Sequence, residues 1–205
     1  MKIKICGITS KEDALNAVSL GADAIGFIFS KESSRYITPE VAEDISLFLP
    51  PFVFLVGVFV DQPKEDIIQT AHQCRLDIIQ LHGHEPPSFC MEIPRRVIKA
   101  FKVSDQEDLK PISMYQGIVS AILLDTKVQN IEGGTGKTFD WGLALKAKEY
   151  DIPLILAGGI TSSNLKKAAT LVNPYAVDLS SGVESAPGKK DYHKMQEVIS
   201  IAQSL

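Results

Sequence analysis

The stretch LILAGGI, from Leu154 to Ile160, sets four apolar residues directly before a pair of glycines. A short, continuous apolar run that ends in a turn signal is typical of a strand covered on both faces, as in a parallel sheet. A parallel strand that leads into a glycine-rich turn late in the chain is also typical of the phosphate sites of β/α barrels. This stretch therefore favours an α/β fold whose site lies at the carboxyl ends of the strands.

The same alternation of apolar runs and amphipathic segments extends from Leu154–Ile160 to both ends of the chain. Eight such runs occur in 205 residues, and a spacing of about 26 residues is close to the smallest strand–helix–strand unit. The predicted strands are Ile3–Cys6, Ala24–Phe29, Val53–Phe59, Ile78–Leu81, Arg96–Ala100, Val119–Leu124, Leu154–Ala157 and Ala176–Leu179.

Start and stop signals for helices lie between these runs. Ser10, Thr38 and Asp191 are suited to N-cap positions, while Pro39 fits the first helical position. Gly21 fits the end of the first helix. The helix after Thr38 is predicted to bury one apolar stripe, made of Val41, Ile45, Phe48 and Leu49.

Parallel strands that alternate with helices form either an open, doubly wound sheet or a closed barrel. An open nucleotide-binding sheet normally has a glycine-rich turn after its first strand, whereas CGIT, Cys6–Thr9, has a single glycine. The glycine-rich turns come late in the chain, and no antiparallel hairpin is indicated. We therefore predict a single-domain (βα)8 TIM barrel of near-minimal length over residues 1–205, with its site at the carboxyl ends of the strands.

Composition excludes several classes of protein. A net charge of −4 gives no basic face for nucleic acid or an anionic membrane. The longest apolar stretch, Phe52–Val60, is far shorter than the roughly 20 residues of a membrane span, and no signal peptide is indicated. The three cysteines, Cys6, Cys74 and Cys90, form no CxxC pair, which favours a reducing, cytoplasmic location over a disulfide framework.

Polar residues lie where the predicted strands end, and a barrel brings such positions to one mouth. Taken singly, each has an ordinary explanation: a strand-end cysteine is more often packed than reactive, an aspartate often caps a loop, and an arginine is usually solvated. Together they are the candidate site residues, namely Cys6, Arg35, Gln80, His82, Asp125 and Asp178.

One motif suggests a metal site and another a nucleotide site, but neither has all the residues that such a site requires. His82 and His84 share a strand-like spacing, but no third ligand is evident, and catalytic metal sites usually need three. The run IEGGTGKT has Ile131 where a P-loop requires its first glycine. We therefore predict no metal, and we interpret Gly133–Lys137 as a mobile lid.

Two later turns are better suited to an anion. Gly158 and Gly159 follow one predicted strand, and Ser181 and Gly182 follow the next. Glycine lets the backbone approach a phosphate closely and present N–H groups, helped by a helix N-terminus. The alternative is that both are simply tight turns, but two of them on adjacent strands favour a phosphate site.

A series of short motifs, taken in order, resembles the phosphoribosylanthranilate isomerase family from the first predicted strand to the last helix. Any one of them is a weak signal, but the ordered set is specific. The motifs are KICGIT (Lys4–Thr9), GADAIGFIF (Gly21–Phe29), SSRYITP (Ser33–Pro39), VGVFV (Val56–Val60), QLHG (Gln80–Gly83), LLDT (Leu123–Thr126), GGTGKTFDW (Gly133–Trp141), LAGGI (Leu156–Ile160) and DLSSGVESAPGKKD (Asp178–Asp191).

The resemblance implies a reaction and a role for each candidate residue. The reaction is the Amadori rearrangement of N-(5′-phosphoribosyl)anthranilate to 1-(2-carboxyphenylamino)-1-deoxyribulose 5-phosphate. The resemblance makes Cys6 the general base and Asp125 the general acid, and it places Arg35 against the anthranilate carboxylate. It assigns the phosphate to Gly158–Gly159 and Ser181–Gly182, and it implies that Gln80, His82 and Asp178 position the substrate.

The chemistry of this reaction suits these residue types. A carboxylic acid can protonate the ring oxygen and open the sugar, and a thiolate can remove the C2 proton of the resulting iminium. The substrate's own nitrogen is the electron sink, so no cofactor is predicted. A thiol that acts as a base is expected to have a lowered pKa, and Lys4, two residues back, is a candidate cause.

Two other functions are weighed against this one. Another barrel isomerase with a phosphoribosyl substrate would normally use a pair of aspartates, where this chain has Cys6. A catalytically silent barrel that binds a phosphorylated metabolite would not need both Cys6 and Asp125. The expected partner is a small phosphorylated substrate, and the chain is expected to be a monomer or a homodimer.

Overall fold

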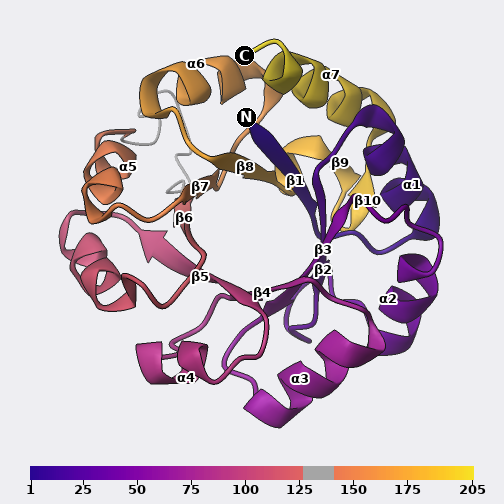
Figure 1. Cartoon of the computed structure of the whole chain (residues 1–205). Coiled ribbons are helices and arrows are strands. Elements are labelled where there is room, and N and C mark those ends of the chain that lie inside the picture. Colours follow the sequence, from indigo (N-terminus) through magenta and orange to yellow (C-terminus); the bar gives the residue numbers. More distant parts are fainter. Residues whose placement is uncertain (127–140) are drawn as a thin grey trace.

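Eight parallel strands close into one barrel, in chain order from β1 to β8, with β8 pairing back onto β1. The structure is a computed structural model that describes residues 1–126 and 141–205. Figure 1 shows the ring of strands with the helices around its outside and the two termini close together. The prediction of a (βα)8 barrel is confirmed. The expected lid, Gly133–Lys137, lies outside the described residues.

The strands lie close to the predicted runs. β5 is three residues longer than predicted, and β6 begins two residues later. The barrel strands are β1 Lys2–Cys6, β2 Ala24–Ile28, β3 Phe54–Phe59, β4 Ile78–Leu81, β5 Arg96–Val103, β6 Ala121–Thr126, β7 Leu154–Ala157 and β8 Ala176–Leu179.

The helices follow the strands around the barrel. The α-helices are α1 Lys11–Leu20, α2 Pro39–Ser46, α3 Lys64–Gln73, α4 Pro87–Met91, α5 Trp141–Ala147, α6 Ser162–Val172 and α7 Tyr192–Gln203. Three 3₁₀ segments accompany them: η1 Glu107–Tyr115, η2 Lys148–Tyr150 and η3 Ser181–Val183. No described helix has the length and apolarity that crossing a membrane requires.

The predicted caps are present. The Ser10 side chain accepts from the N–H of Asp13 at 3.2 Å, and Gly21 ends α1 with a φ of 106°. Thr38 caps α2 and Asp191 caps α7. These short-range signals were readable because each depends on one side chain and the neighbouring backbone.

Two local predictions are wrong. The apolar stripe of α2 is only partly buried: the helix ends at Ser46, so Phe48 lies beyond it and, like Val41, is exposed. An antiparallel hairpin, with β9 Glu184–Ala186 and β10 Lys189–Lys190, follows β8 although none was expected. Its strands are too short to show a two-residue alternation, and Gly188 makes the turn with a φ of 79°.

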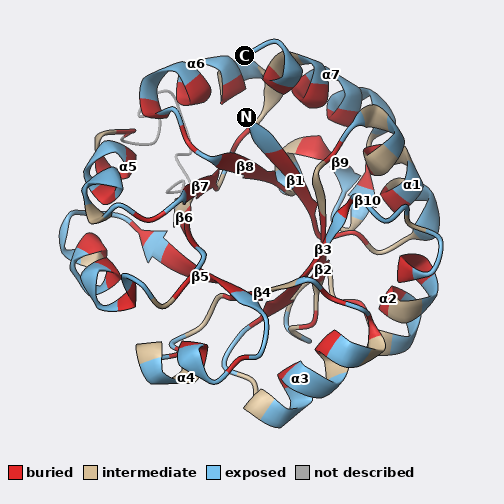
Figure 2. Cartoon of the chain, in the orientation of Figure 1, coloured by how far each residue is buried: buried red, intermediate tan, exposed pale blue. Residues whose placement is uncertain are grey.

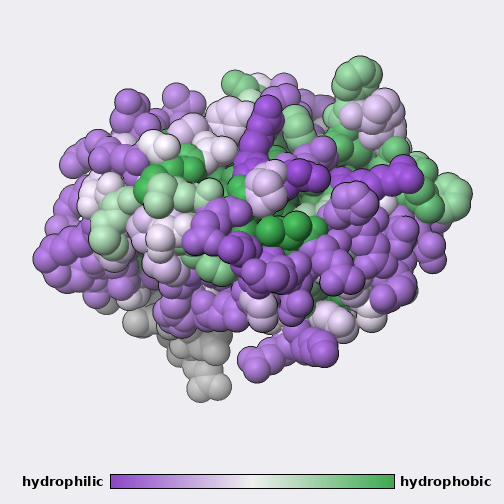
Figure 3. All heavy atoms as spheres, turned by 60° about the horizontal axis from the view of Figure 1, so that its bottom comes forward, coloured by the Kyte–Doolittle hydropathy of each residue, from purple (hydrophilic) through white to green (hydrophobic). Residues whose placement is uncertain are grey.

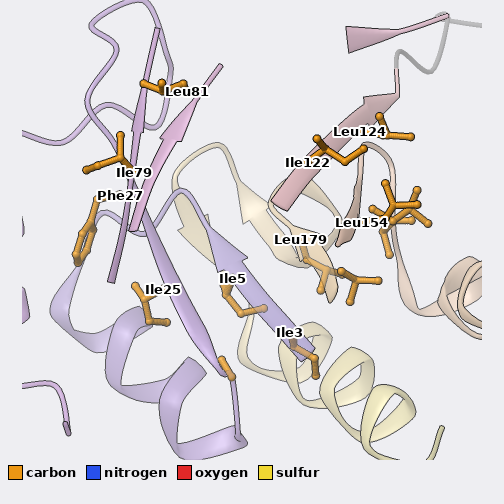
Figure 4. Close-up of a cluster of buried hydrophobic side chains, with 14 of the residues drawn as sticks. Ile3, Ile5, Ile25, Phe27, Ile79, Leu81, Ile122, Leu124, Leu154 and Leu179 are labelled. Atoms are coloured by element: carbon orange, nitrogen blue, oxygen red, sulfur yellow. The ribbon is translucent and has the colours of Figure 1, made fainter. Parts of the chain in front are cut away.

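Alternation along each strand separates the core from the barrel interior. In β1, Ile3 and Ile5 point outward and pack with apolar residues of the neighbouring strands (Figure 4). Figure 2 shows the matching pattern on the helices, buried where they face the barrel and exposed outside. Lys4 and Cys6, on the other face of β1, therefore point into the barrel.

The interior of the barrel contains a cavity at each end. The cavity at the carboxyl ends has a volume of about 250 Å³ and is rich in polar residues. The cavity at the amino ends measures about 360 Å³ and has a mainly apolar lining that includes Phe54, Val56 and Ile98. On the outer surface in Figure 3, hydrophobic residues form small, separate patches on a mainly hydrophilic face.

Candidate active site

The cavity at the carboxyl ends of the strands brings together all ten residues singled out from the sequence. They come from six strands and the loops that follow, and they span most of the chain. These lining residues are Cys6, Arg35, Gln80, His82, Asp125, Gly158, Gly159, Asp178, Ser181 and Gly182. Barrel geometry explains the convergence, because the carboxyl end of every strand opens onto the same mouth.

Cys6 and Asp125 border this cavity from different parts of the ring. Cys6 ends β1 and is 5% exposed. Asp125, the penultimate residue of β6, has 37% of its side chain exposed. Three steps separate β1 from β6 around the barrel, through β8 and β7. A ligand in the cavity can therefore meet a thiol on one side and a carboxyl on another.

His82 connects the Asp125 carboxyl to β4. Its Nε2 lies 3.3 Å from Asp125 Oδ2, and its Nδ1 lies 3.4 Å from the amide nitrogen of Gln80. If that amide donates to Nδ1, the ring proton is on Nε2 and points at Asp125. In this tautomer Nε2–H can donate to the Asp125 carboxylate.

The two glycine-containing loops lie side by side after β7 and β8, which are paired strands. Gly158 and Gly159 have φ values of 78° and 63°, which favour glycine. A Cβ on Gly182 would lie 2.0 Å from the carbonyl oxygen of Ile160, so the two loops touch where only glycine fits. The N-terminus of α6 follows immediately, and this combination suits a phosphate.

The model of one protein family, described as N-(5′-phosphoribosyl)anthranilate isomerase, matches residues 3–201 of the chain. The chain belongs to this family. A family relative from Geobacter metallireducens is 53% identical over 204 residues, which cover 100% of both chains. The solved family structure from Thermotoga maritima has a TM-score of 0.93 at 47% identity, again with 100% of both chains covered.

A second solved isomerase of this family is in complex with reduced 1-(o-carboxyphenylamino)-1-deoxyribulose 5-phosphate. It shares 44% identity with this chain and has a TM-score of 0.91, and the match covers 100% of both chains. The isomerase family and the barrel fold, which were both expected from the sequence, are thereby confirmed.

The prediction that the pKa of Cys6 is lowered is wrong. Burial raises the pKa of the thiol above its usual value, and the positive charge of Lys4 opposes this rise only in part. The sequence showed which charge would be near, but it could not show how completely the sulfur would be removed from water. The resting residue is therefore a protonated thiol at neutral pH.

Arg35 is held in place by an ion pair with Glu184. Its Nε and Nη2 donate to the two carboxylate oxygens of Glu184 at 2.8 and 2.7 Å. Lys190 donates to the same carboxylate at 2.8 Å. Burial acts to raise the pKa of Glu184, but these two cations lower it below its usual range. Glu184 thus engages the edge of the guanidinium that carries Nε and Nη2, and not Nη1.

Sequence reasoning missed Glu184, Lys190 and Ser180 in this part of the isomerase. Glu184 is 149 positions from Arg35, and no periodic signal links residues so far apart. Ser180 lines the cavity, and its buried hydroxyl has no partner in the described part of the chain. The side-chain oxygens Gln80 Oε1 and Asp178 Oδ1 are likewise unpartnered among the described residues. Buried polar atoms need hydrogen bonds, so these three atoms are candidate acceptors or donors for a ligand.

Proposed function

We propose that this chain converts N-(5′-phosphoribosyl)anthranilate to 1-(2-carboxyphenylamino)-1-deoxyribulose 5-phosphate, with residues 1–205 acting as one catalytic domain. The observation that supports this most is the single cavity that holds both Cys6 and Asp125 in a member of the isomerase family. A relative whose bound ligand is the reduced form of that product gives independent support.

The acid step belongs to Asp125. Its carboxyl gives a proton to the ring oxygen of the sugar, the ring opens, and an iminium forms with the anthranilate nitrogen. The resulting carboxylate lies 3.3 Å from His82 Nε2, which can donate to it. His82 and, behind it, Gln80 thus position the acid and stabilise its product form.

The base step belongs to Cys6. The thiolate takes the C2 proton of the iminium, the electrons move to the substrate nitrogen, and an enolamine forms that tautomerises to the ketone. Because burial raises the thiol pKa, only a small fraction of the resting protein has the thiolate form. General acid and base groups still contribute about 10²–10⁴-fold each.

The remaining lining residues hold the substrate. The phosphate is assigned to Gly158–Gly159 and Ser181–Gly182, and the anthranilate carboxylate to Arg35. The unpartnered Oδ1 of Asp178 is suited to accept from a sugar hydroxyl. Buried groups of this kind reject analogues that lack the matching hydroxyl, because such analogues leave the groups unpaired.

The test is the consumption of phosphoribosylanthranilate, followed by its fluorescence, with purified protein and no added metal or cofactor. Turnover that disappears in Cys6→Ala supports the proposal. Binding of the reduced product analogue without turnover would instead favour a silent metabolite-binding barrel. Turnover of an aminoimidazole ribonucleotide in place of this substrate would favour the other barrel isomerase.

We also propose that the chain forms a homodimer in the cytoplasm. A Thermotoga maritima relative is described as dimeric. Phe52 is 97% exposed and lies two residues before Phe54, which lines the apolar cavity at the amino ends of the strands. A second copy would cover both surfaces. Light scattering should show a dimer that Phe52→Asp converts to a monomer, and a monomeric parent protein would contradict the proposal.

A further inference from the structure

Lys4 is a buried lysine that lies inside the barrel rather than at its surface. It precedes Cys6 by two residues on β1, so both side chains point inward, and it is only 3% exposed. Its Nζ donates to Asp178 Oδ2 at 2.9 Å, and the two residues are register partners in β1 and β8. A buried ammonium is costly unless it is paired, and Asp178 supplies the pair.

A gap in β2 brings this ammonium to the thiol. Gly26 is the register partner of Cys6, and a Cβ there would lie 2.8 Å from Cys6 Sγ and 3.0 Å from Lys4 Cε. The absent side chain therefore leaves the space in which the lysine stem and the sulfur meet. At this range the positive charge of Lys4 opposes the rise in the pKa of the Cys6 thiol.

Other charged groups near the thiol are already matched to one another. Arg35, from the loop after β2, and Lys190, from β10, both interact with Cys6 through charge, but both are ion-paired with Glu184. Lys4 is paired with Asp178. Three cations and two carboxylates leave an excess of one positive charge around the sulfur. Of these cations, Lys4 does most to oppose the rise in the thiol pKa.

The two carboxylate oxygens of Asp178 have different surroundings. Oδ2 accepts from Lys4, and Oδ1 is buried without a partner in the part of the chain that the structure describes. Asp178 itself lines the cavity. One carboxylate thus holds the ammonium beside the thiol and still offers an acceptor to a ligand.

We propose that Lys4 is a positioning residue that stabilises the Cys6 thiolate, and that Asp178 fixes the place of its ammonium. This inference rests on the proposed function, in which Cys6 is the base. The thiol proton leaves to water in the open cavity, the ammonium keeps its own protons throughout, and the thiolate then accepts the C2 proton of the substrate.

The test measures the thiol directly. The rate at which iodoacetamide alkylates Cys6 is followed by peptide mass analysis between pH 7 and 10, in the parent protein and in Lys4→Met. Cys74 and Cys90 are internal references, because burial raises their pKa to about 12 and about 11. At an effective dielectric constant of about 20, a unit positive charge a few ångströms from the sulfur stabilises the thiolate strongly. We therefore expect the Cys6 rate at pH 8 to fall about tenfold or more, with the whole curve moved to higher pH.

Two further variants separate this role from a structural one. Lys99→Met also removes a buried, paired lysine, and it should leave the Cys6 curve within about twofold of the parent. The double variant Lys4→Met/Asp178→Asn removes both charges, so no unpaired carboxylate is left to prevent folding. Its curve should still lie at higher pH than that of the parent protein. The proposal is overturned if the pH dependence of Cys6 alkylation is unchanged in folded Lys4→Met. If Lys4→Met does not fold, an unchanged pH dependence in the double variant overturns it.

Turnover provides a second readout. In Lys4→Met, kcat should fall by about the same factor as the alkylation rate, with KM nearly unchanged. The titration needs no substrate. A parent protein that fails to consume phosphoribosylanthranilate would therefore refute the proposed function, while the alkylation curves would still decide whether Lys4 stabilises the thiolate.

Discussion

Three lysine–carboxylate pairs are buried in the described part of this barrel, and two of them are bonded very differently. Lys4 and Asp178 join β1 to β8 inside the barrel, whereas Lys99 and Glu85 connect β5 to the loop after β4. Both lysine side chains are at most 4% exposed. In the first pair, Asp178 borders the site cavity, and one of its carboxylate oxygens has no partner among the described residues. The second is saturated.

The saturation of the second pair is visible in its contacts. Lys99 Nζ donates to Glu85 at 3.0 Å and to the carbonyl of Gly83 at 2.7 Å, with two more carbonyls at 3.3 Å. Glu85 also accepts from the backbone N–H groups of Asp61 and Gly83. A charge whose bonds are all made within the protein holds the fold together, whereas a buried charge with an open bond beside a cavity is available to a ligand.

The largest effect on turnover should come from the two groups that react inside the mouth. Cys6→Ala and Asp125→Ala should each lower kcat by about 10²–10⁴-fold. The dissociation constant of the reduced product analogue should change little, because neither group is assigned to binding. Steady-state kinetics and calorimetry measure the two quantities. Near-normal turnover in either variant would remove its assigned role.

The saturated pair should matter for stability instead. Removing one partner of a buried ion pair typically costs about 3–5 kcal/mol, so Lys99→Met should lower the free energy of unfolding by that amount. Lys110→Met is the matched control, because Lys110 is 70% exposed in its own ion pair, and it should cost less than about 0.5 kcal/mol. Urea denaturation measures both. Equal costs in the two variants would contradict the contrast drawn between buried and exposed pairs.

A smaller effect is expected where Arg35 meets the substrate. Lysine cannot bind Glu184 on one edge and a ligand carboxylate on the other, so Arg35→Lys should raise KM by roughly tenfold, the effect of about 1.4 kcal/mol. The kcat value should change less. An unchanged KM for phosphoribosylanthranilate would refute the proposed contact.

Most of the fold could be predicted from the sequence because the signals for strands and helix ends are local. Gly158 directly follows the run of β7 and Ser180 directly follows the run of β8. These two strands, and also β4, begin and end where predicted. The prediction for the apolar stripe of α2 was wrong because Phe48 continues the apolar period beyond the point at which the helix ends. The β9–β10 hairpin was missed because two- and three-residue strands have no period to detect.

The candidate site was predictable as a set of positions but not as a set of bonds. Barrel topology alone gathers strand-end residues such as Cys6 and Asp125 at one mouth. The pairing of Arg35 with Glu184 depends on a hairpin that no local pattern indicated. The pKa direction of Cys6 depends on the balance between burial and charge, which only the packed structure provides.

The central claim is that the buried thiol of Cys6 is the base, and the pH dependence of a variant without the acid tests it most directly. In the parent protein, turnover requires both a thiolate and a proton donor, so its pH profile reports on two groups at once. In Asp125→Asn only the thiol requirement remains. Because burial raises the thiol pKa, residual kcat/KM should rise with pH between 7 and 9, approaching tenfold per unit. A flat or falling profile would contradict the account.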